Sequence, residues 1–170
     1  MKAIFKWLSF MAGIIIMFII LYNYVFFVIV VPSPSMHPTI KVGDRIITSR
    51  IHDIDLINTG DILVFYSEEL EEILVKRVIG LPNDTVEINS KGEVFVNNKE
   101  LNEPYVKVPD TKSGSFKVPD KEYFFLGDYR EHSYDSRSWN NPYILRENII
   151  GKAEFILFPF NRISNLNNLN

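Results

Sequence analysis

A long uncharged run near the start constrains this chain more than any other feature. From Leu8 to Val31 no residue carries a charge. As a helix, a run of about 24 residues rises about 36 Å, which is enough to cross the hydrocarbon core of a bilayer. Lys2 and Lys6 precede the run, as in a secretory signal peptide, but the run is longer than the apolar region of such a signal, about 7–15 residues, and no small-x-small cleavage site follows it. We therefore predict an uncleaved, single transmembrane helix.

Composition excludes several classes of function. The chain has 170 residues and a formal net charge of −3 without a basic cluster, so no nucleic-acid partner is expected. It has no cysteine, which excludes disulfides and thiolate metal sites. His37, His52 and His132 lack the spacing of metal ligands, so we expect neither a metal nor a cofactor.

The rest of the chain reads as short strands separated by turn signals. Runs rich in β-branched and aromatic residues alternate with Gly-Asp, Asn-Asp and Lys-Gly turns. No convincing helix occurs after the apolar run. The fold class is therefore mainly β. The predicted strands lie within Lys41–Ile51, Asp61–Ser67, Ile73–Gly80, the Thr85–Asn97 hairpin, Glu122–Asp128 and Ile149–Phe158. The polar stretch from Asn97 to Asp120 is expected to hold little regular structure.

Ser35 lies in a stiff connection directly after the apolar run. The sequence PSPSMHPT, residues 32–39, places three prolines around this serine, which excludes both a helix and a central strand. Such a segment can present a hydroxyl and nearby N–H groups in a fixed geometry, as a nucleophile with an oxyanion hole requires. The alternative is a plain linker between an anchor and a domain.

A serine nucleophile needs a base, and Lys76 is the best-placed lysine for that role. It lies in the apolar run ILVKRVIG, where burial would lower its pKa towards neutrality. Side chains alternate across a strand, so Lys76 and its neighbour Arg77 are predicted to face opposite sides. The alternative for Lys76 is a surface lysine whose stem packs on the sheet.

A third polar segment, GDYREHSYDSR, spans Gly127 to Arg137. Its arginines and acids predict a loop held by internal ion pairs, such as Asp135 with Arg137 or Arg130. A triad of His132 with Ser35 is conceivable, but no acid is marked to orient that histidine.

Four motifs together resemble those of bacterial type I signal peptidases. PSPSMHPT, GDILV, KRVIGLPND and GDYREHSYDSR occur in the family's order behind one N-terminal anchor. The single anchor and compact catalytic part are similar to the Gram-positive form. The lysine distinguishes the chain from the Ser-His enzymes of archaea and the endoplasmic reticulum.

The resemblance implies a role for individual residues. Ser35 matches the nucleophile and Lys76 the general base. Ser33 matches the serine whose hydroxyl joins the nucleophile's own N–H in the oxyanion hole, and Ser133 the serine that orients the lysine. Met36 matches a residue that packs beneath the nucleophile. The residues that match those bracing the last loop are Asp128, Asp135 and Arg137.

The chain departs from the family pattern at four positions. The family's last motif usually reads GDNRDNSxDSR, whereas this chain has Tyr129, Glu131 and His132. These substitutions put the outer contacts of the loop in doubt. Pro34 stands where a small residue is common, and it removes one N–H beside Ser35.

The resemblance also implies an organisation and a location. Residues 1–31 are expected to form a cytoplasmic stub and transmembrane anchor, and residues 32–170 an extracytoplasmic β-rich catalytic domain. The implied activity is removal of signal peptides from translocated preproteins by a serine endopeptidase with a Ser-Lys dyad, at the cell membrane. The implied partners are preproteins, the lipid bilayer and the protein translocation machinery.

Three other functions stay open. A Ser-Lys peptidase dedicated to one substrate, such as a pilin, would carry the same motifs. A self-cleaving repressor shares the chemistry but needs a DNA-binding domain where this chain has an apolar run. A non-catalytic scaffold of a secretion complex would result if the substituted loop misplaced Ser133 and left Lys76 charged.

Overall fold

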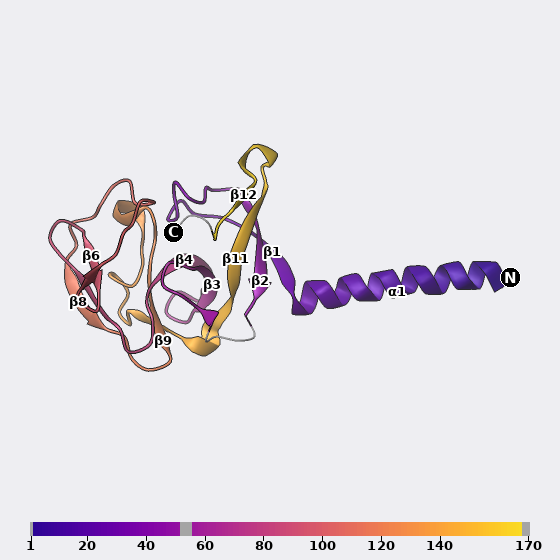
Figure 1. Cartoon of the computed structure of the whole chain (residues 1–170), viewed down its shortest axis with the longest axis horizontal. Helices are drawn as coiled ribbons and strands as arrows, with labels where there is room; N and C mark the ends of the chain where they lie inside the picture. Colours follow the sequence, from indigo (N-terminus) through magenta and orange to yellow (C-terminus); the bar gives the residue numbers. More distant parts are fainter. Residues whose placement is uncertain (1, 52–55, 168–170) are drawn as a thin grey trace.

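The fold is mainly β, as predicted. The structure is a computed structural model that describes residues 2–51 and 56–167. Helix α1 (Lys2–Tyr24) projects away from a body of two β-sheets (Figure 1). The larger sheet has the strand order β1-β2-β11-β3-β4-β9-β10, with β12 also paired to β11. Its strands are β1 (Phe26–Val30), β2 (Arg45–Arg50), β11 (Ile149–Phe158), β3 (Ile62–Ser67), β4 (Glu72–Gly80), β9 (Glu122–Leu126), β10 (Tyr143–Leu145) and β12 (Ser164–Asn165).

The smaller sheet lies at the end of the body remote from α1 (Figure 1). Its strand order is β7-β6-β5-β8, and all its pairs are antiparallel. The strands are β5 (Thr85–Ile88), β6 (Val94–Val96), β7 (Lys99–Glu100) and β8 (Gly114–Lys117). Short 3₁₀ turns complete the described elements at Arg130–His132, Arg146–Asn148 and Phe160–Arg162.

The apolar run does not form one helix, so the prediction of a helix from Leu8 to Val31 is wrong in its last part. Helix α1 ends at Tyr24, and the residues FFVIV form strand β1. β1 pairs along its whole length with β2, from Phe26 opposite Ser49 to Val30 opposite Arg45. β-branched and aromatic residues favour strands, and this pairing satisfies their backbone groups. Residues that the sequence assigned to an anchor thus belong to the sheet.

Helix α1 carries large apolar side chains that are exposed along most of its length. They include Phe5, Trp7, Phe10, Ile16 and Phe18, each more than half exposed. A search of the described residues for a helix long and apolar enough to cross a membrane finds none.

The predicted strands are otherwise close to the observed ones. β2, β3, β4, the β5–β6 hairpin, β9 and β11 all fall within the predicted ranges or one residue outside them. The stretch from Asn97 to Asp120 is more regular than predicted, because it contributes β7 and β8 to the smaller sheet. The last residues of that range, and the segment before β8, lie in loops.

Strand β4 carries Lys76 next to a part of its edge that no other described strand covers. Its residues from Glu72 to Arg77 pair with β3 on one edge, whereas β9 pairs with the other edge only from Arg77 to Gly80. Within residues 2–51 and 56–167, no strand covers that second edge between Glu72 and Lys76. An extended peptide could therefore add to the sheet beside Lys76.

Candidate active site

Ser35 sits in a turn whose next residue is anchored in a hydrophobic core. Met36 is 1% exposed and packs with buried residues that include Val31 and Ile40. Ser35 is itself buried, and its Oγ lies 3.4 Å from Ser33 Oγ. The turn is closed by a hydrogen bond from the backbone N–H of His37 to the carbonyl of Pro34. The proline-rich segment therefore holds two hydroxyls side by side.

Lys76 is buried in the middle of the larger sheet. It is 3% exposed, and its Nζ donates a hydrogen bond of 3.2 Å to Ser133 Oγ. Burial lowers the pKa of the Lys76 ammonium from 10.5 to about 8, while Asp135 raises it and Arg137 lowers it by smaller amounts. A lysine with such a pKa is partly neutral near pH 7 and can accept a proton.

Gly127 brings the serine segment and the lysine's partner together. A Cβ at this position would come within 2.5 Å of the carbonyl oxygen of Ser35 and within 2.2 Å of Ser133 Oγ. Any larger residue would push the two segments apart, so the glycine is required for their close approach. Ser35, Ser133 and Lys76 thus converge around one residue of the GDYREHSYDSR segment. Among the described contacts, Ser35 Oγ and Lys76 Nζ do not form a direct hydrogen bond.

Arg77 points to the other face of β4 and forms a buried ion pair. Its Nε and Nη2 donate to the two carboxylate oxygens of Asp128 at 2.9 and 2.8 Å, and both side chains are 0% exposed. Asp128 also accepts a hydrogen bond from the Thr39 hydroxyl, which links it to the segment that carries Ser35. The same carboxylate therefore connects β4 with the serine turn.

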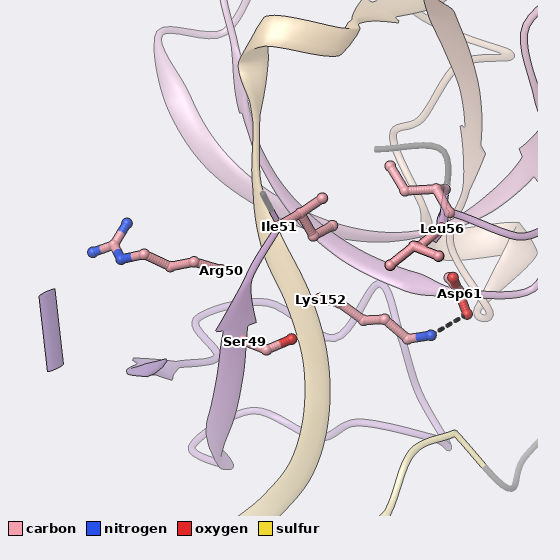
Figure 2. A pocket seen from close by; sticks show the side chains of 7 residues that line it. Ser49, Arg50, Ile51, Leu56, Asp61 and Lys152 are labelled. Atoms are coloured by element: carbon pink, nitrogen blue, oxygen red, sulfur yellow. Dashed lines mark hydrogen bonds and ion pairs between the residues drawn. The ribbon is translucent and has the colours of Figure 1, made fainter. Parts of the chain in front are cut away.

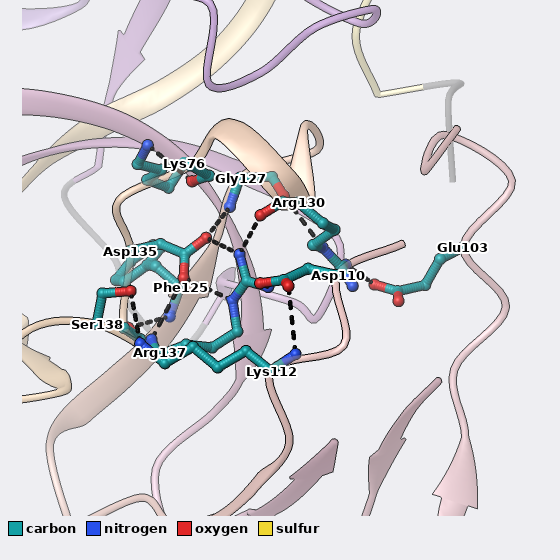
Figure 3. A network of polar contacts seen from close by, with 12 residues as sticks. Lys76, Glu103, Asp110, Lys112, Phe125, Gly127, Arg130, Asp135, Arg137 and Ser138 are labelled. Atoms are coloured by element: carbon teal, nitrogen blue, oxygen red, sulfur yellow. Dashed lines mark hydrogen bonds and ion pairs between the residues drawn. The ribbon is translucent and has the colours of Figure 1, made fainter. Parts of the chain in front are cut away.

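A second buried pair braces the last loop (Figure 3). Arg137 donates to both carboxylate oxygens of Asp135, at 2.8 and 2.9 Å, and also to the carbonyl of Arg130. Asp135 in turn accepts a 3.0 Å hydrogen bond from the backbone N–H of Gly127. The ion pair predicted between Asp135 and Arg137 is therefore present, whereas Arg130 binds Glu103 instead.

Sequence reasoning missed the residues that hold this loop from outside. Glu103 pairs with Arg130, and Asp110 accepts a 2.8 Å hydrogen bond from Arg137 (Figure 3). Tyr105 is buried, and the Arg77 guanidinium lies 3.7 Å from the centre of its ring. Burial raises the pKa of the Tyr105 hydroxyl, which donates to Glu103 at 2.9 Å. The only signal for them in the sequence was that Glu103 and Tyr105 flank a proline.

The position of Ser133 answers the question raised by the departures from the family pattern. Tyr129, Glu131 and His132 precede it in the loop, yet Ser133 is 91% buried and accepts a hydrogen bond from Lys76. Glu131 and His132 have mostly exposed side chains, and the Nε2 of this histidine lies 3.9 Å from the Glu131 carboxylate. The substitutions therefore change the outer surface of the loop.

A cavity of about 400 Å³ lies elsewhere, beside β2 and β11. Lys152 and Asp61 lie in its wall and form an ion pair of 2.7 Å, and Arg50 points away from it (Figure 2). It contains none of Ser33, Ser35, Lys76 and Ser133.

In the part of the chain that the structure describes, no group of three or more His, Cys, Asp or Glu residues could hold a metal ion. His52 lies outside the described residues.

Comparisons with known proteins point to one family. The family model "Signal peptidase, peptidase S26" matches residues 4–158. Signal peptidase I of Leptolyngbya laminosa is 41% identical over 146 residues, covering 80% of this chain and 70% of that protein. Signal peptidase I S of Bacillus subtilis strain 168 is 30% identical over an alignment of 179 residues, covering 98% and 95%. The crystal structure of a signal peptidase I from Enterococcus faecalis V583 is 27% identical with a TM-score of 0.50, covering 59% of this chain and 98% of that one. This chain belongs to the signal peptidase family, peptidase S26.

Proposed function

We propose that this signal peptidase cleaves preproteins with a dyad in which Ser35 is the nucleophile and Lys76 the general base. The observation that carries the proposal is the convergence of Ser35, Ser133 and buried Lys76 around Gly127. Because burial lowers the pKa of Lys76 to about 8, this side chain is neutral in a fraction of the molecules near pH 7.

The steps follow from these positions. Ser35 Oγ attacks the carbonyl carbon of the scissile peptide, and its proton passes to Lys76 Nζ. The oxyanion is stabilised by the backbone N–H of Ser35 and the hydroxyl of Ser33. The C–N bond then breaks as Lys76 returns the proton to the leaving amine, which leaves the signal peptide as an ester on Ser35. Water then attacks this ester while Lys76 takes its proton. The bond between the carbonyl carbon and Ser35 Oγ breaks as Lys76 gives that proton to Ser35 Oγ, and the signal peptide leaves as a free acid that ionises to the carboxylate.

The uncovered edge of β4 suggests how the substrate is held. An extended segment ending at the scissile bond would pair with the backbone between Glu72 and Lys76. Its alternate side chains would point to the same side of the sheet, which agrees with small residues at −1 and −3 as the expected cleavage signal. Serine attack would then occur at the end of the added strand beside Lys76.

Membrane attachment is a further part of the proposal. Helix α1 is supported in this role by its exposed apolar side chains, and a surface of this kind marks contact with lipid or protein. In the proposed arrangement the N-terminus is cytoplasmic, α1 makes a single pass, and the catalytic domain acts outside the cytoplasm next to the translocation machinery. Membrane flotation and protease protection of the full chain in vesicles would test this arrangement. Extraction of the chain by carbonate would contradict the membrane anchor, and digestion of the catalytic domain by protease on the cytoplasmic side would contradict the orientation.

The dyad is tested with the full chain in detergent and a preprotein carrying an A-x-A site. Wild type is expected to cut after the second alanine, as mass spectrometry of the products would show. Ser35→Ala and Lys76→Ala are expected to be folded and inactive. Ser115→Ala, at an exposed serine of β8, and Lys152→Met serve as matched controls that stay active.

Cleavage by either dyad variant at the wild-type rate would refute the assignment. Inactivity of wild type on several preproteins would favour a dedicated peptidase or a scaffold instead.

A further inference from the structure

Three rings form a cluster beside the serine turn. Tyr129 lies between two histidines, with its ring centre 5.7 Å from that of His37 and 4.5 Å from that of His132. His37 is exposed, Tyr129 is partly exposed, and the His132 side chain is 57% exposed. These three residues, called the ring cluster, therefore present aromatic surface to the solvent.

The ring cluster is fixed relative to the proposed nucleophile. The backbone N–H of Tyr129 donates a 3.0 Å hydrogen bond to the carbonyl of Ser35. His37 is only two residues beyond Ser35, and Thr39 binds Asp128, the residue before Tyr129. These contacts join the serine turn and the loop at several points, so the loop that carries Tyr129 is held close to Ser35.

The sheet topology directs the second half of the substrate towards these rings. A peptide added to the edge of β4 occupies the line between Glu72 and Lys76, and β9 takes over the same line from Arg77 onwards. The residues after the scissile bond cannot continue along that line. They would have to leave the sheet close to the point where the chain itself leaves β9, after Leu126.

We propose that the ring cluster binds the first residues after the cleavage site and favours aromatic or large apolar side chains there. The proposal rests on the dyad function described above. Three adjoining rings offer dispersion and edge-to-face contacts to a side chain of that class. An acidic side chain is disfavoured because the Glu131 carboxylate, which lies 3.9 Å from His132 Nε2, would repel its negative charge. Tyr129 and His132 replace the amides of the usual motif, which lack such ring faces.

The test uses three preproteins that differ only in the first two residues after an A-x-A site, which are Phe-Phe, Ser-Ser or Asp-Asp. We expect wild type to cut the Phe-Phe substrate with a kcat/KM about threefold to tenfold above that for Ser-Ser, with Asp-Asp the poorest. Tyr129→Asn combined with His132→Asn should remove the preference, so that its kcat/KM values for Phe-Phe and Ser-Ser agree within about twofold. Tyr134→Asn is the control, because this exposed tyrosine of the same loop makes no described contact with the ring cluster.

Each outcome bears on one of the two proposals. Cleavage of Ser-Ser by wild type but by neither Ser35→Ala nor Lys76→Ala supports the dyad regardless of any preference. Equal rates on Phe-Phe and Ser-Ser, or a preference for Asp-Asp, would overturn the role of the ring cluster. So would an equal loss on all three substrates in the double variant, since this would indicate that the rings only support the loop. A wild type that cuts none of the three would overturn both.

Discussion

Lys76 and Lys152 occupy equivalent places in the sheet but meet different partners. Leu63 of β3 pairs with Lys76 of β4 on one side and with Lys152 of β11 on the other. Lys152 lies 2.7 Å from the Asp61 carboxylate and its side chain is 25% exposed, whereas Lys76 is 3% exposed and, among the described residues, its Nζ binds the Ser133 hydroxyl alone. The partner, and not the position in the sheet, therefore distinguishes a candidate base from a structural lysine.

The two carboxylates that lie near Lys76 in the site form ion pairs with arginines. Asp128 is held by Arg77 and Asp135 by Arg137, each through two hydrogen bonds to the guanidinium. A bidentate arginine pair is stronger and more directional than a lysine contact. Both carboxylates thus stabilise the loop without forming a direct ion pair with the lysine.

Exchanging each lysine for methionine should give the largest contrast. Lys76→Met removes the proposed base, so we expect kcat/KM for a preprotein to fall by roughly 100-fold to 10,000-fold. The kcat/KM of Lys152→Met should stay within about threefold of wild type, because the Lys152 amine lines a cavity that contains none of the proposed catalytic residues. Steady-state cleavage assays on both variants measure this, and similar losses would contradict the distinction.

Giving Lys76 a carboxylate should convert it towards the state of Lys152. In Ser133→Asp the new charge stabilises the ammonium and raises the pKa of Lys76. Activity needs the neutral amine, so wild-type kcat/KM should rise with pH and level off above about 8. In the variant this limb should move to higher pH, with a loss of about 10-fold to 100-fold at neutral pH.

Ser133→Ala is the control for that change, because it removes the hydroxyl without adding charge. It should lower the rate but leave the rising limb near or below that of wild type. Identical pH profiles for Ser133→Asp and Ser133→Ala would show that the carboxylate does not control the protonation of Lys76.

The ring of Tyr105 should matter for activity although it lies outside the four motifs. Tyr105→Leu uncovers Arg77 and loosens its pair with Asp128, so we expect kcat/KM to fall about tenfold. Tyr105→Phe keeps the ring over the guanidinium and loses only the hydroxyl bond to Glu103, and it should stay within about threefold of wild type. Equal effects of the two substitutions on cleavage would exclude the ring contact as the cause.

The sequence predicted the strands well because strand patterns are local. The apolar density of ILVKRVIG indicated β4, and the alternation of side chains along a strand placed Lys76 and Arg77 on opposite faces. The apolar run was harder, since a short apolar stretch has the same composition in a helix and in a buried strand, and only pairing with β2 separates β1 from α1.

Long-range contacts were beyond sequence reasoning. Glu103 and Asp110 reach Arg130 and Arg137 across 27 residues of chain, through the smaller sheet. No local pattern marks such pairs, because the acids lie in a polar stretch where exposed carboxylates are common. Gly127 is a similar case, since its need for close approach depends on two segments that only the fold brings together.

The smallest expected effect concerns stability, and it reveals what burying an unpaired lysine costs. An amine whose pKa is lower in the folded chain binds fewer protons there than in the unfolded chain. The cost is therefore fully present below pH 8 and disappears as the pH rises from about 8 towards 10.5. Lys76→Met should unfold with a free energy about 1 kcal/mol higher than wild type at pH 7, a fraction of the roughly 3 kcal/mol that the full pKa shift represents. Urea unfolding of both chains at pH 7 and pH 10 measures the difference, which should shrink at the higher pH.

Lys152→Met should give no such gain, because it breaks the pair with Asp61 and leaves that carboxylate without its partner. A gain in Lys76→Met that did not change with pH would point to packing instead of charge.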